Sequence, residues 1–193
     1  VYTRDEGTME IFGKSYDDLT PKQAQEAGVA IIHQELNMCK HLTVTENMFL
    51  GREVKGGLSL NNAKMRKEAK RVLDDLRIDI SPDQIVGDLP VSKQQMVEIA
   101  KALSINARIL IMDEPTKGID VGAKYSIYEI MNSLACKGYG IIMVSSEMPE
   151  VLGVADRVVV MKSGRVTGEF GDMETVTQEM LLEASLKERE GHK

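Results

Sequence analysis

The sequence predicts an α/β fold with a layered core around a parallel sheet. Two observations support this fold class. Apolar segments of strand length alternate with segments of helix length. In addition, the segments ILIM (109–112), IIMV (141–144) and VVVM (158–161) contain no polar residue. Strands that are apolar throughout are typical of a parallel sheet that is buried on both faces.

The first elements are predicted from start and stop signals. An apolar stretch at 9–12 indicates a short strand, and the Thr20-Pro21 pair marks the start of a helix. Gly28 ends that helix and leads into an apolar strand at 29–32. Residues 37–88 show no strong strand and one clear helix, with apolar residues at helical spacing through 65–76.

From residue 89 onward, helices and strands alternate in a regular order. We expect helices at 93–104, 123–137 and 149–154, and strands at 108–112, 140–145 and 157–161. A turn at 162–165 leads into a strand at 166–170, and a last helix begins at Thr177 and ends in a charged tail.

Composition excludes several classes of protein. The chain has 193 residues, 42% hydrophobic and 28% charged, which suits one soluble globular domain. A net charge of -6 argues against a protein that wraps nucleic acid. The longest apolar run falls well short of the roughly 20 residues that span a bilayer. Cys39 and Cys136 lack metal-ligand spacing, so we expect packing roles in a reducing compartment.

The stretch GTMEIFGKS (7–15) comes close to a phosphate-binding loop but does not match it. That loop requires G-x-x-x-x-G-K-[ST], and here the position five residues before Gly13 is Thr8. Met9, Ile11 and Phe12 suit a strand better than a loop of converging backbone amides. We therefore expect a strand and a turn here, with Lys14 in solvent.

The clearest chemical signal is ILIMDEPT (109–116), in which an apolar strand ends in two adjacent carboxylates. Ligands of open α/β sheets bind at the carboxyl ends of the strands. Asp113 can hold Mg²⁺ there, and Glu114 can orient and deprotonate a water that attacks a phosphate. Taken alone, the two residues could also cap a turn before Pro115.

The surrounding motifs resemble the ATPase subunits of ATP-binding cassette (ABC) transporters, and among these the chain is similar to the monosaccharide importers. The motifs that carry the resemblance stand in the family's order: HQELN (33–37), VSKQQMVEIAKA (91–102), MDEPT (112–116), GIDVGAK (118–124) and SSEMPEVLG (145–153). The resemblance implies a P-loop NTPase core with a helical subdomain. It divides the chain into an ATPase-core part (1–36), a helical subdomain (37–88), a second core part (89–172) and a C-terminal helix with tail (173–193).

The resemblance also implies roles for single residues. Gln34 would help to hold Mg²⁺ and the attacking water, with Asp113 on the metal and Glu114 as the base. Asp120 would lie at the interface of paired ATPase domains. Ser92, Lys93 and Gln94 would face the phosphates of ATP, either as donors or only as the start of a helix.

Two departures from the family pattern bear on activity. Pro90 stands where the signature motif has a serine, and the glycines of that motif are absent. Ser146 stands where the family has its switch histidine, and a hydroxyl cannot make the charged contact of an imidazolium. Slow or absent hydrolysis is therefore expected at a site that depends on Ser146.

The resemblance further suggests an N-terminally incomplete domain. The phosphate loop would precede Val1, so we expect the isolated chain to be deficient in hydrolysis. Residues up to MDEPT look like the first of the family's two tandem ATPase domains, and those after it look like the second. This gives the hypothesis of a hybrid with a seam at 116–118, and an intact two-domain reading frame at the locus would refute it.

The function implied by the resemblance is ATP-driven import of a monosaccharide of the galactose/methyl galactoside or ribose type. Its cofactors would be ATP and Mg²⁺. Its partners would be a transmembrane permease, a second ATPase domain and, indirectly, a periplasmic or extracellular sugar-binding protein, with no nucleic acid. The permease would hold the chain at the cytoplasmic face of the membrane. Two other classes stay open: a non-catalytic ABC-like partner domain, and a soluble ABC ATPase of translation or DNA repair.

Overall fold

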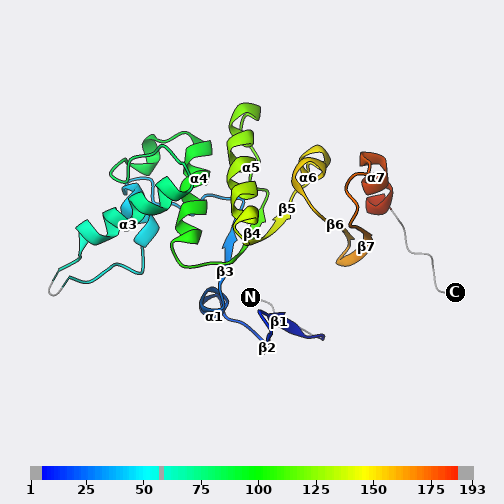
Figure 1. The fold of residues 1–193 in the computed structure, drawn as a ribbon, viewed down its shortest axis with the longest axis horizontal. Coiled ribbons are helices and arrows are strands. Elements are labelled where there is room, and N and C mark those ends of the chain that lie inside the picture. Colours follow the sequence, from blue (N-terminus) through cyan, green and yellow to red (C-terminus); the bar gives the residue numbers. More distant parts are fainter. Residues whose placement is uncertain (1–5, 57–58, 187–193) are drawn as a thin grey trace. The chain divides into compact units, whose positions relative to one another are not determined.

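The computed structural model describes residues 6–56 and 59–186 (Figure 1). The chain divides into two compact units, Val1–Val144 and Ser145–Lys193, and each is described by itself. The charged tail expected at 187–193 lies outside the described residues.

The near-miss loop motif forms a hairpin. Strands β1 (Met9–Ile11) and β2 (Lys14–Tyr16) pair antiparallel, with Ile11 opposite Lys14. The two residues between them, Phe12 and Gly13, both have positive φ, of 50° and 76°. Such a turn matches the twist of a two-residue hairpin. The predicted strand and turn are therefore confirmed, and Lys14 is exposed on β2.

The next two elements begin and end as predicted. Helix α1 (Pro21–Glu26) starts in a capping box, in which the Thr20 hydroxyl accepts from the Gln23 backbone N–H and the Gln23 side chain accepts from the Thr20 backbone N–H. Gly28, with φ of 86°, turns the chain out of α1 and into strand β3 (Val29–Ile32).

The helical segment contains more helix than the sequence predicts. It has α2 (Val44–Phe49) and α3 (Asn62–Asp75), a 3₁₀ turn η1 (Val86–Asp88), and then α4 (Val91–Leu103). The one clear helix predicted in 37–88 is α3, and α2 comes in addition, because it is too short for a periodic pattern to show. The first turn of α2 is stabilised by a capping box between Thr43 and Glu46.

A parallel sheet forms the centre of the first unit. Strands β3, β4 (Ile109–Asp113) and β5 (Gly140–Val144) lie in that order, and α5 (Val121–Cys136) connects the last two (Figure 1). One face of the sheet, which includes Ile32 and Met112, joins the hydrophobic core together with residues of α4 and α5. On the other face Ile31 and Ile142 are 53% and 54% exposed. The expectation of burial on both faces therefore fails for β5.

The second unit corrects one further expectation. It contains α6 (Met148–Val154), β6 (Val158–Lys162), β7 (Arg165–Phe170) and α7 (Gln178–Leu186). The segment VVVM lies on β6 and pairs antiparallel with β7 instead of joining a parallel sheet. The Ser163-Gly164 turn, with φ of 50° and 76°, makes this hairpin, and α7 packs against both of its strands.

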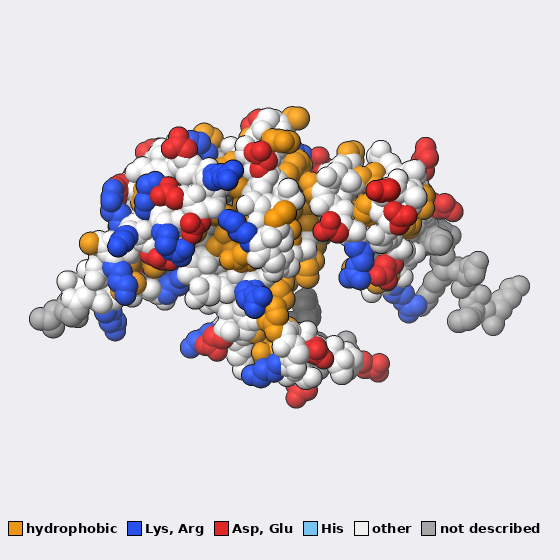
Figure 2. Space-filling view, viewed as in Figure 1, with side chains coloured by type: hydrophobic (Ala, Val, Ile, Leu, Met, Phe, Trp, Pro, Cys, Tyr) orange, Lys and Arg blue, Asp and Glu red, His pale blue; other side chains and the backbone are white. Residues whose placement is uncertain are grey.

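The surface of the first unit is rich in charge over α3. Figure 2 shows Lys and Arg side chains interleaved with acidic ones on this part of the molecule. Arg66 pairs with Asp83 through two nitrogens, at 2.7 to 2.9 Å.

Cys39 and Cys136 are both exposed, so the packing role expected for them is wrong. Within the described residues, every helix is too short or too polar to cross a membrane.

Candidate functional site at the carboxyl edge of the sheet

The ends of the three parallel strands bring the predicted metal-binding residues to one edge. Ile32 of β3 lies opposite Met112 of β4, so Gln34 and Asp113 both leave the sheet at its carboxyl end. Asp113 is the half-buried last residue of β4, and Gln34 is exposed in the loop after β3. Asp113, with its carboxylate, and Gln34, with its amide oxygen, therefore lie at the same edge of the sheet, where open sheets bind their ligands.

Glu114 is held in an unusual backbone conformation. Its φ is 47°, in the left-handed region that costs a residue other than glycine about 1–2 kcal/mol. Its backbone N–H donates to the Val144 carbonyl at 2.8 Å, which fixes it to the end of β5. Strained residues that neighbouring structure holds in place are concentrated at functional sites. This geometry agrees with the role predicted for the Glu114 carboxylate, although the positive φ itself was not predicted from the sequence.

The loop after Glu114 is ordered by its own hydrogen bonds. The Lys117 N–H donates to the Glu114 carbonyl and the Ile119 N–H to the Thr116 carbonyl, each at 3.1 Å. Asp120 then caps α5, because its carboxylate accepts from the Ala123 N–H at 3.0 Å. The structure thus gives Asp120 a local task, and its place at a domain interface stays a prediction.

The residues expected to face phosphates lie at the start of α4. Pro90 is the N-cap and offers no side-chain hydrogen bond to the first turn. The Lys93 ammonium donates to the Asp79 carbonyl at 3.2 Å, and the Gln94 amide donates to the Leu89 carbonyl at 2.7 Å. These contacts hold both side chains against their own unit. Ser92 and the backbone N–H groups of the first turn are the donors that an anion could use.

The structure reveals one charged residue that sequence reasoning missed. Glu98 of α4 is 9% exposed, and its Oε1 has no hydrogen-bond partner among the described residues. Burial raises the pKa of its carboxyl group, while Lys101, the backbone of Asn37 and His33 oppose the rise. An unsatisfied buried polar atom costs about 1–3 kcal/mol. A helical projection that placed Glu98 on the same side of α4 as buried Gln94 would have identified it.

Ser146 belongs to the second unit, in the turn before α6. There the Ser145 hydroxyl donates to the Glu150 carboxylate at 2.6 Å and accepts from the Glu147 N–H at 3.1 Å. The role of Ser146 in place of the switch histidine stays a prediction.

The donors at the edge of the sheet fit Mg²⁺. This ion prefers oxygen ligands and takes one or two protein carboxylates together with phosphate and water oxygens. Asp113 and Gln34 can supply such oxygens. Within 6–56 and 59–186, no group of three or more His, Cys, Asp or Glu side chains gathers to hold a metal. The oxygens of Asp113 and Gln34 suit an ion whose remaining ligands are phosphate and water oxygens.

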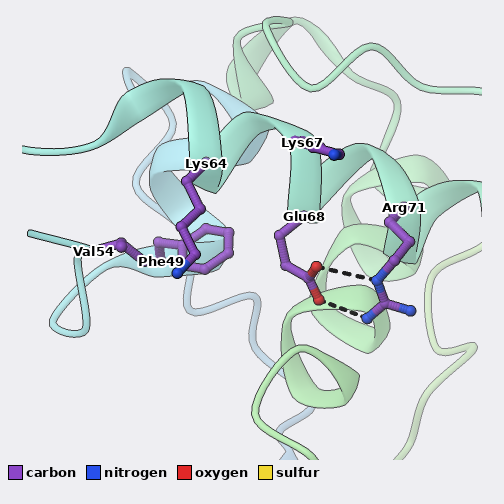
Figure 3. Close-up of a pocket in the computed structure, with 6 residues that line it drawn as sticks. All are labelled: Phe49, Val54, Lys64, Lys67, Glu68 and Arg71. Atoms are coloured by element: carbon purple, nitrogen blue, oxygen red, sulfur yellow. Dashed lines mark hydrogen bonds and ion pairs between the residues drawn. The ribbon is translucent and has the colours of Figure 1, made fainter. Parts of the chain in front are cut away.

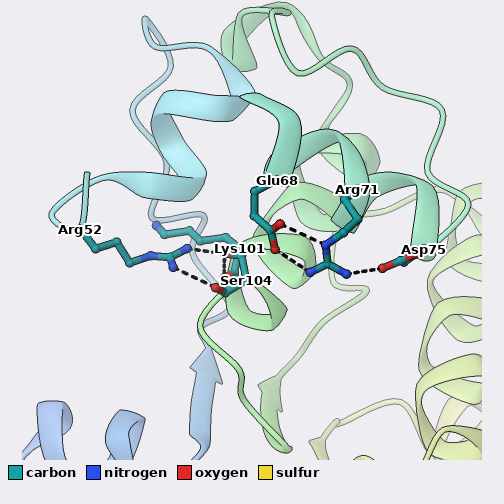
Figure 4. Close-up of polar contacts among 6 residues, drawn as sticks. All are labelled: Arg52, Glu68, Arg71, Asp75, Lys101 and Ser104. Atoms are coloured by element: carbon teal, nitrogen blue, oxygen red, sulfur yellow. Dashed lines mark hydrogen bonds and ion pairs between the residues drawn. The ribbon is translucent and has the colours of Figure 1, made fainter. Parts of the chain in front are cut away.

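A hollow of about 390 Å³ in the first unit lies away from this edge, with Phe49 and Val54 at its base and charged side chains of α3 around it (Figure 3). Beside it, the Arg52 guanidinium donates to the Ser104 carbonyl at 3.0 Å and joins the end of α2 to the end of α4 (Figure 4). We place the candidate site at the sheet edge because the residues with the predicted chemistry, Asp113, Glu114 and Gln34, lie there.

The chain matches a known protein family over more than half of its length. The sequence model of the family described as ABC transporter matches residues 1–117. The chain is 44% identical over 165 residues to a protein of Agrobacterium fabrum designated ribose/galactose/methyl galactoside import ATP-binding protein 1. That match covers 86% of this chain and 33% of the relative. A protein of Albidiferax ferrireducens with a corresponding designation is 37% identical over 100% of this chain and 39% of its own length. The chain thus spans about a third of the length of these relatives.

Solved structures show the same fold. The ADP conformation of MJ1267, an ATP-binding cassette of an ABC transporter, matches with a TM-score of 0.78 and 24% identity, over 90% of this chain and 72% of that one. The dimeric post-hydrolysis state of the cassette MJ0796 matches with a TM-score of 0.70 and 22% identity, over 88% and 75%. The predicted α/β fold of an ABC ATPase is confirmed.

Proposed function

Because the chain belongs to the ABC transporter family, we propose that it is part of an ATPase subunit that couples ATP hydrolysis to monosaccharide import. The observation that carries the proposal is the Asp113–Glu114 pair at the carboxyl edge of a parallel sheet, beside the strand that leads to Gln34. The designations of the relatives support a sugar of the ribose, galactose or methyl galactoside class.

The proposed roles rest on the family resemblance, and the places of these residues at the ends of the strands support them. Asp113 and Gln34 hold Mg²⁺, which when bound neutralises charge on the phosphate oxygens of ATP. The Glu114 carboxylate accepts a hydrogen bond from a water, orients it and takes its proton as that water attacks the γ-phosphorus, while the bond to the bridging oxygen breaks and ADP leaves. Its strained backbone fixes the carboxylate at the end of β4, so that little reorganisation is needed during the reaction.

The proposal includes weak activity for the 193-residue polypeptide by itself. Its sequence contains no G-x-x-x-x-G-K-[ST] segment, and GKS at 13–15 lies in a hairpin. No backbone cradle for the β- and γ-phosphates is therefore supplied within these residues. Isothermal titration calorimetry is expected to show an affinity for Mg-ATP weaker than micromolar. A micromolar dissociation constant would contradict this part of the proposal.

The proposed partners follow from the membership of the chain in the ABC transporter family. Residues 37–88 form the helical subdomain that docks on a permease, and a second ATPase domain faces Ser92, Lys93 and Asp120. The permease keeps the subunit at the cytoplasmic face of the membrane, and a sugar-binding protein acts from the other side. A non-catalytic role for this domain is the second candidate, favoured by the Pro90 N-cap, which offers no side-chain donor.

Co-purification tests the proposed function. The tagged complete subunit is isolated from detergent-solubilised membranes of its own organism, and the bound proteins are identified by mass spectrometry. We expect a permease with membrane-spanning helices in equal amount. Recovery with ribosomes or DNA, and without a permease, would overturn the proposal in favour of a soluble ABC ATPase. A permease together with hydrolysis that survives Glu114→Gln would favour the non-catalytic candidate.

A further inference from the structure

A second hollow of the first unit lies at the amino edge of the parallel sheet, at the opposite end of β4 from Asp113. Its volume is about 480 Å³, a size at which protein cavities bind small molecules. Arg108 and Tyr139 directly precede β4 and β5, which pair in parallel, so these two lining residues are neighbours at the start of the sheet. The other polar lining side chains come from the ends of α3 and α5 and from the loop after α4: Arg71, Lys137 and Asn106.

The lining of this hollow is positively charged. Three of its residues are cations and none is acidic. Arg71 is already neutralised, because its guanidinium pairs with Glu68 and Asp75. Lys137 donates to the Asp75 carbonyl at 3.1 Å, and an ammonium has two further N–H groups to offer. The charge available to a ligand therefore comes from Lys137 and Arg108.

Three donors in the lining are free to bind a ligand. The Arg108 guanidinium lies 5.0 Å from the centre of the Phe12 ring, and within residues 6–56 and 59–186 it pairs with no carboxylate. In the same part of the chain, neither the Asn106 amide nor the Tyr139 hydroxyl has a hydrogen-bond partner. A guanidinium, an ammonium, an amide and a hydroxyl around one hollow suit an oxyanion, and Arg and Lys are the usual binders of phosphate.

We propose that the hollow at the amino edge binds a small molecule through a phosphate group, with Arg108 and Lys137 as charged donors and Asn106 and Tyr139 as neutral ones. A phosphate monoester carries a charge of about -1.5 to -2 at neutral pH, so it gains more from two cations than a carboxylate does. The whole length of β4 separates this hollow from Asp113. The inference thus goes beyond the proposed function, which involves the carboxyl edge of the sheet.

An NMR titration of the 193-residue chain with inorganic phosphate tests the site without ATP or a permease. At about pH 7.5 phosphate is mostly dianionic. With the ionic strength held constant, we expect the amide signals of Arg108, Gly138 and Tyr139 to shift and to reach saturation together at millimolar phosphate. Acetate at the same concentrations should shift these signals by less than about a tenth as much, because it carries a single charge and only two oxygens.

Substitutions assign the binding to the hollow. Arg108→Gln removes a charge at an exposed position, and the dissociation constant for phosphate should rise at least about tenfold, as for the loss of a charged hydrogen bond. Tyr139→Phe removes only the hydroxyl and keeps the net charge, so the constant should rise about three- to tenfold. Arg165→Gln, at an exposed position of β7, is the matched control and should leave the constant within about twofold.

Three results would overturn the phosphate site: no saturable shift of these signals, an equal loss of affinity in Arg108→Gln and Arg165→Gln, or acetate that binds as tightly as phosphate. Phosphate that shifts the signals of Gln34, Ser92 and Asp113 instead would also overturn it. Because neither ATP hydrolysis nor permease binding is measured, failure of the phosphate site is distinguishable from failure of the proposed transport function.

Discussion

The backbone N–H of Glu114 donates to the carbonyl of Val144 at 2.8 Å and ties the end of β4 to the end of β5. With this bond, Glu114 keeps a left-handed φ of 47°, which few residues other than glycine adopt. The carboxylate that we propose as the base is thus positioned by its own backbone and by the neighbouring strand.

Loss of this carboxylate should abolish hydrolysis while binding persists. In the complete subunit assembled with its permease, Glu114→Gln is expected to lower the ATPase rate by about 10²- to 10⁴-fold, the usual contribution of a general base. Phosphate release measures the rate, and fluorescent nucleotide titration should show affinity within about threefold of wild type. Glu129→Gln, at an exposed position on α5, is the control and should leave the ATPase rate unchanged. A variant with a tenth or more of wild-type activity would exclude Glu114 as the base.

Asn47 should be the most sensitive polar residue of the helical segment. It is fully buried, its Oδ1 accepts from the Cys39 N–H at 2.8 Å, and its Nδ2 donates to the carbonyls of Cys39, Leu42 and Thr43. Asn47→Ala leaves the Cys39 N–H without its acceptor and removes one donor from each of the three carbonyls, which keep their backbone donors, so the free energy of unfolding should fall by about 1–3 kcal/mol. Urea unfolding followed by circular dichroism measures this. A change below about 0.5 kcal/mol would show that water replaces the side chain.

Arg77 offers a stabilising substitution. It follows α3 with φ of 57°, and the Ile78 N–H donates to the Leu73 carbonyl at 2.9 Å, as in a helix end that favours glycine. Arg77→Gly should therefore raise the free energy of unfolding by about 1 kcal/mol. Arg77→Ala removes the same exposed side chain but keeps the strained backbone. Equal stability of the two variants in thermal unfolding would contradict this reasoning.

Glu46 should make the stability of α2 depend on pH. Hydrogen bonds from the backbone N–H and then the hydroxyl of Thr43 lower the pKa of its carboxyl group. A lowered folded-state pKa gives stability that is present above the ordinary value of about 4.3 and lost as the pH falls through the folded-state value. The stability difference between wild type and Glu46→Gln should thus shrink below about pH 4. A difference that stays constant from pH 7 to 3 in urea unfolding would count against the capping box.

The sequence predicts strands better than it predicts their partners. ILIM and VVVM have the same apolar character, yet the first is the central strand of a parallel sheet and the second belongs to a hairpin. What separates them is the connection that follows. A helix leads from β4 to β5, whereas only Ser163-Gly164 separates β6 from β7. The residues that follow a strand therefore indicate how it pairs, which its hydrophobicity does not.

The candidate site was predictable in its residue types but not in its geometry. Asp113, Glu114 and Gln34 follow apolar strands, and the rule for open sheets places them at one edge. The backbone conformation of Glu114 is held by a hydrogen bond to Val144, which is remote in sequence, and the burial of Glu98 depends on tertiary packing around α4. Such contacts leave no periodic signal.

The pairing of β3 with β4 has a consequence for how the chain folds. Val29 lies opposite Ile109, so all of α2, α3 and α4 lie within the loop that this short ladder closes. Closing a long loop is entropically costly until the helices inside it have become compact. We expect α2, α3 and α4 to collapse early and the β3–β4 ladder to complete last, so substitutions in the helices should slow refolding of the sheet.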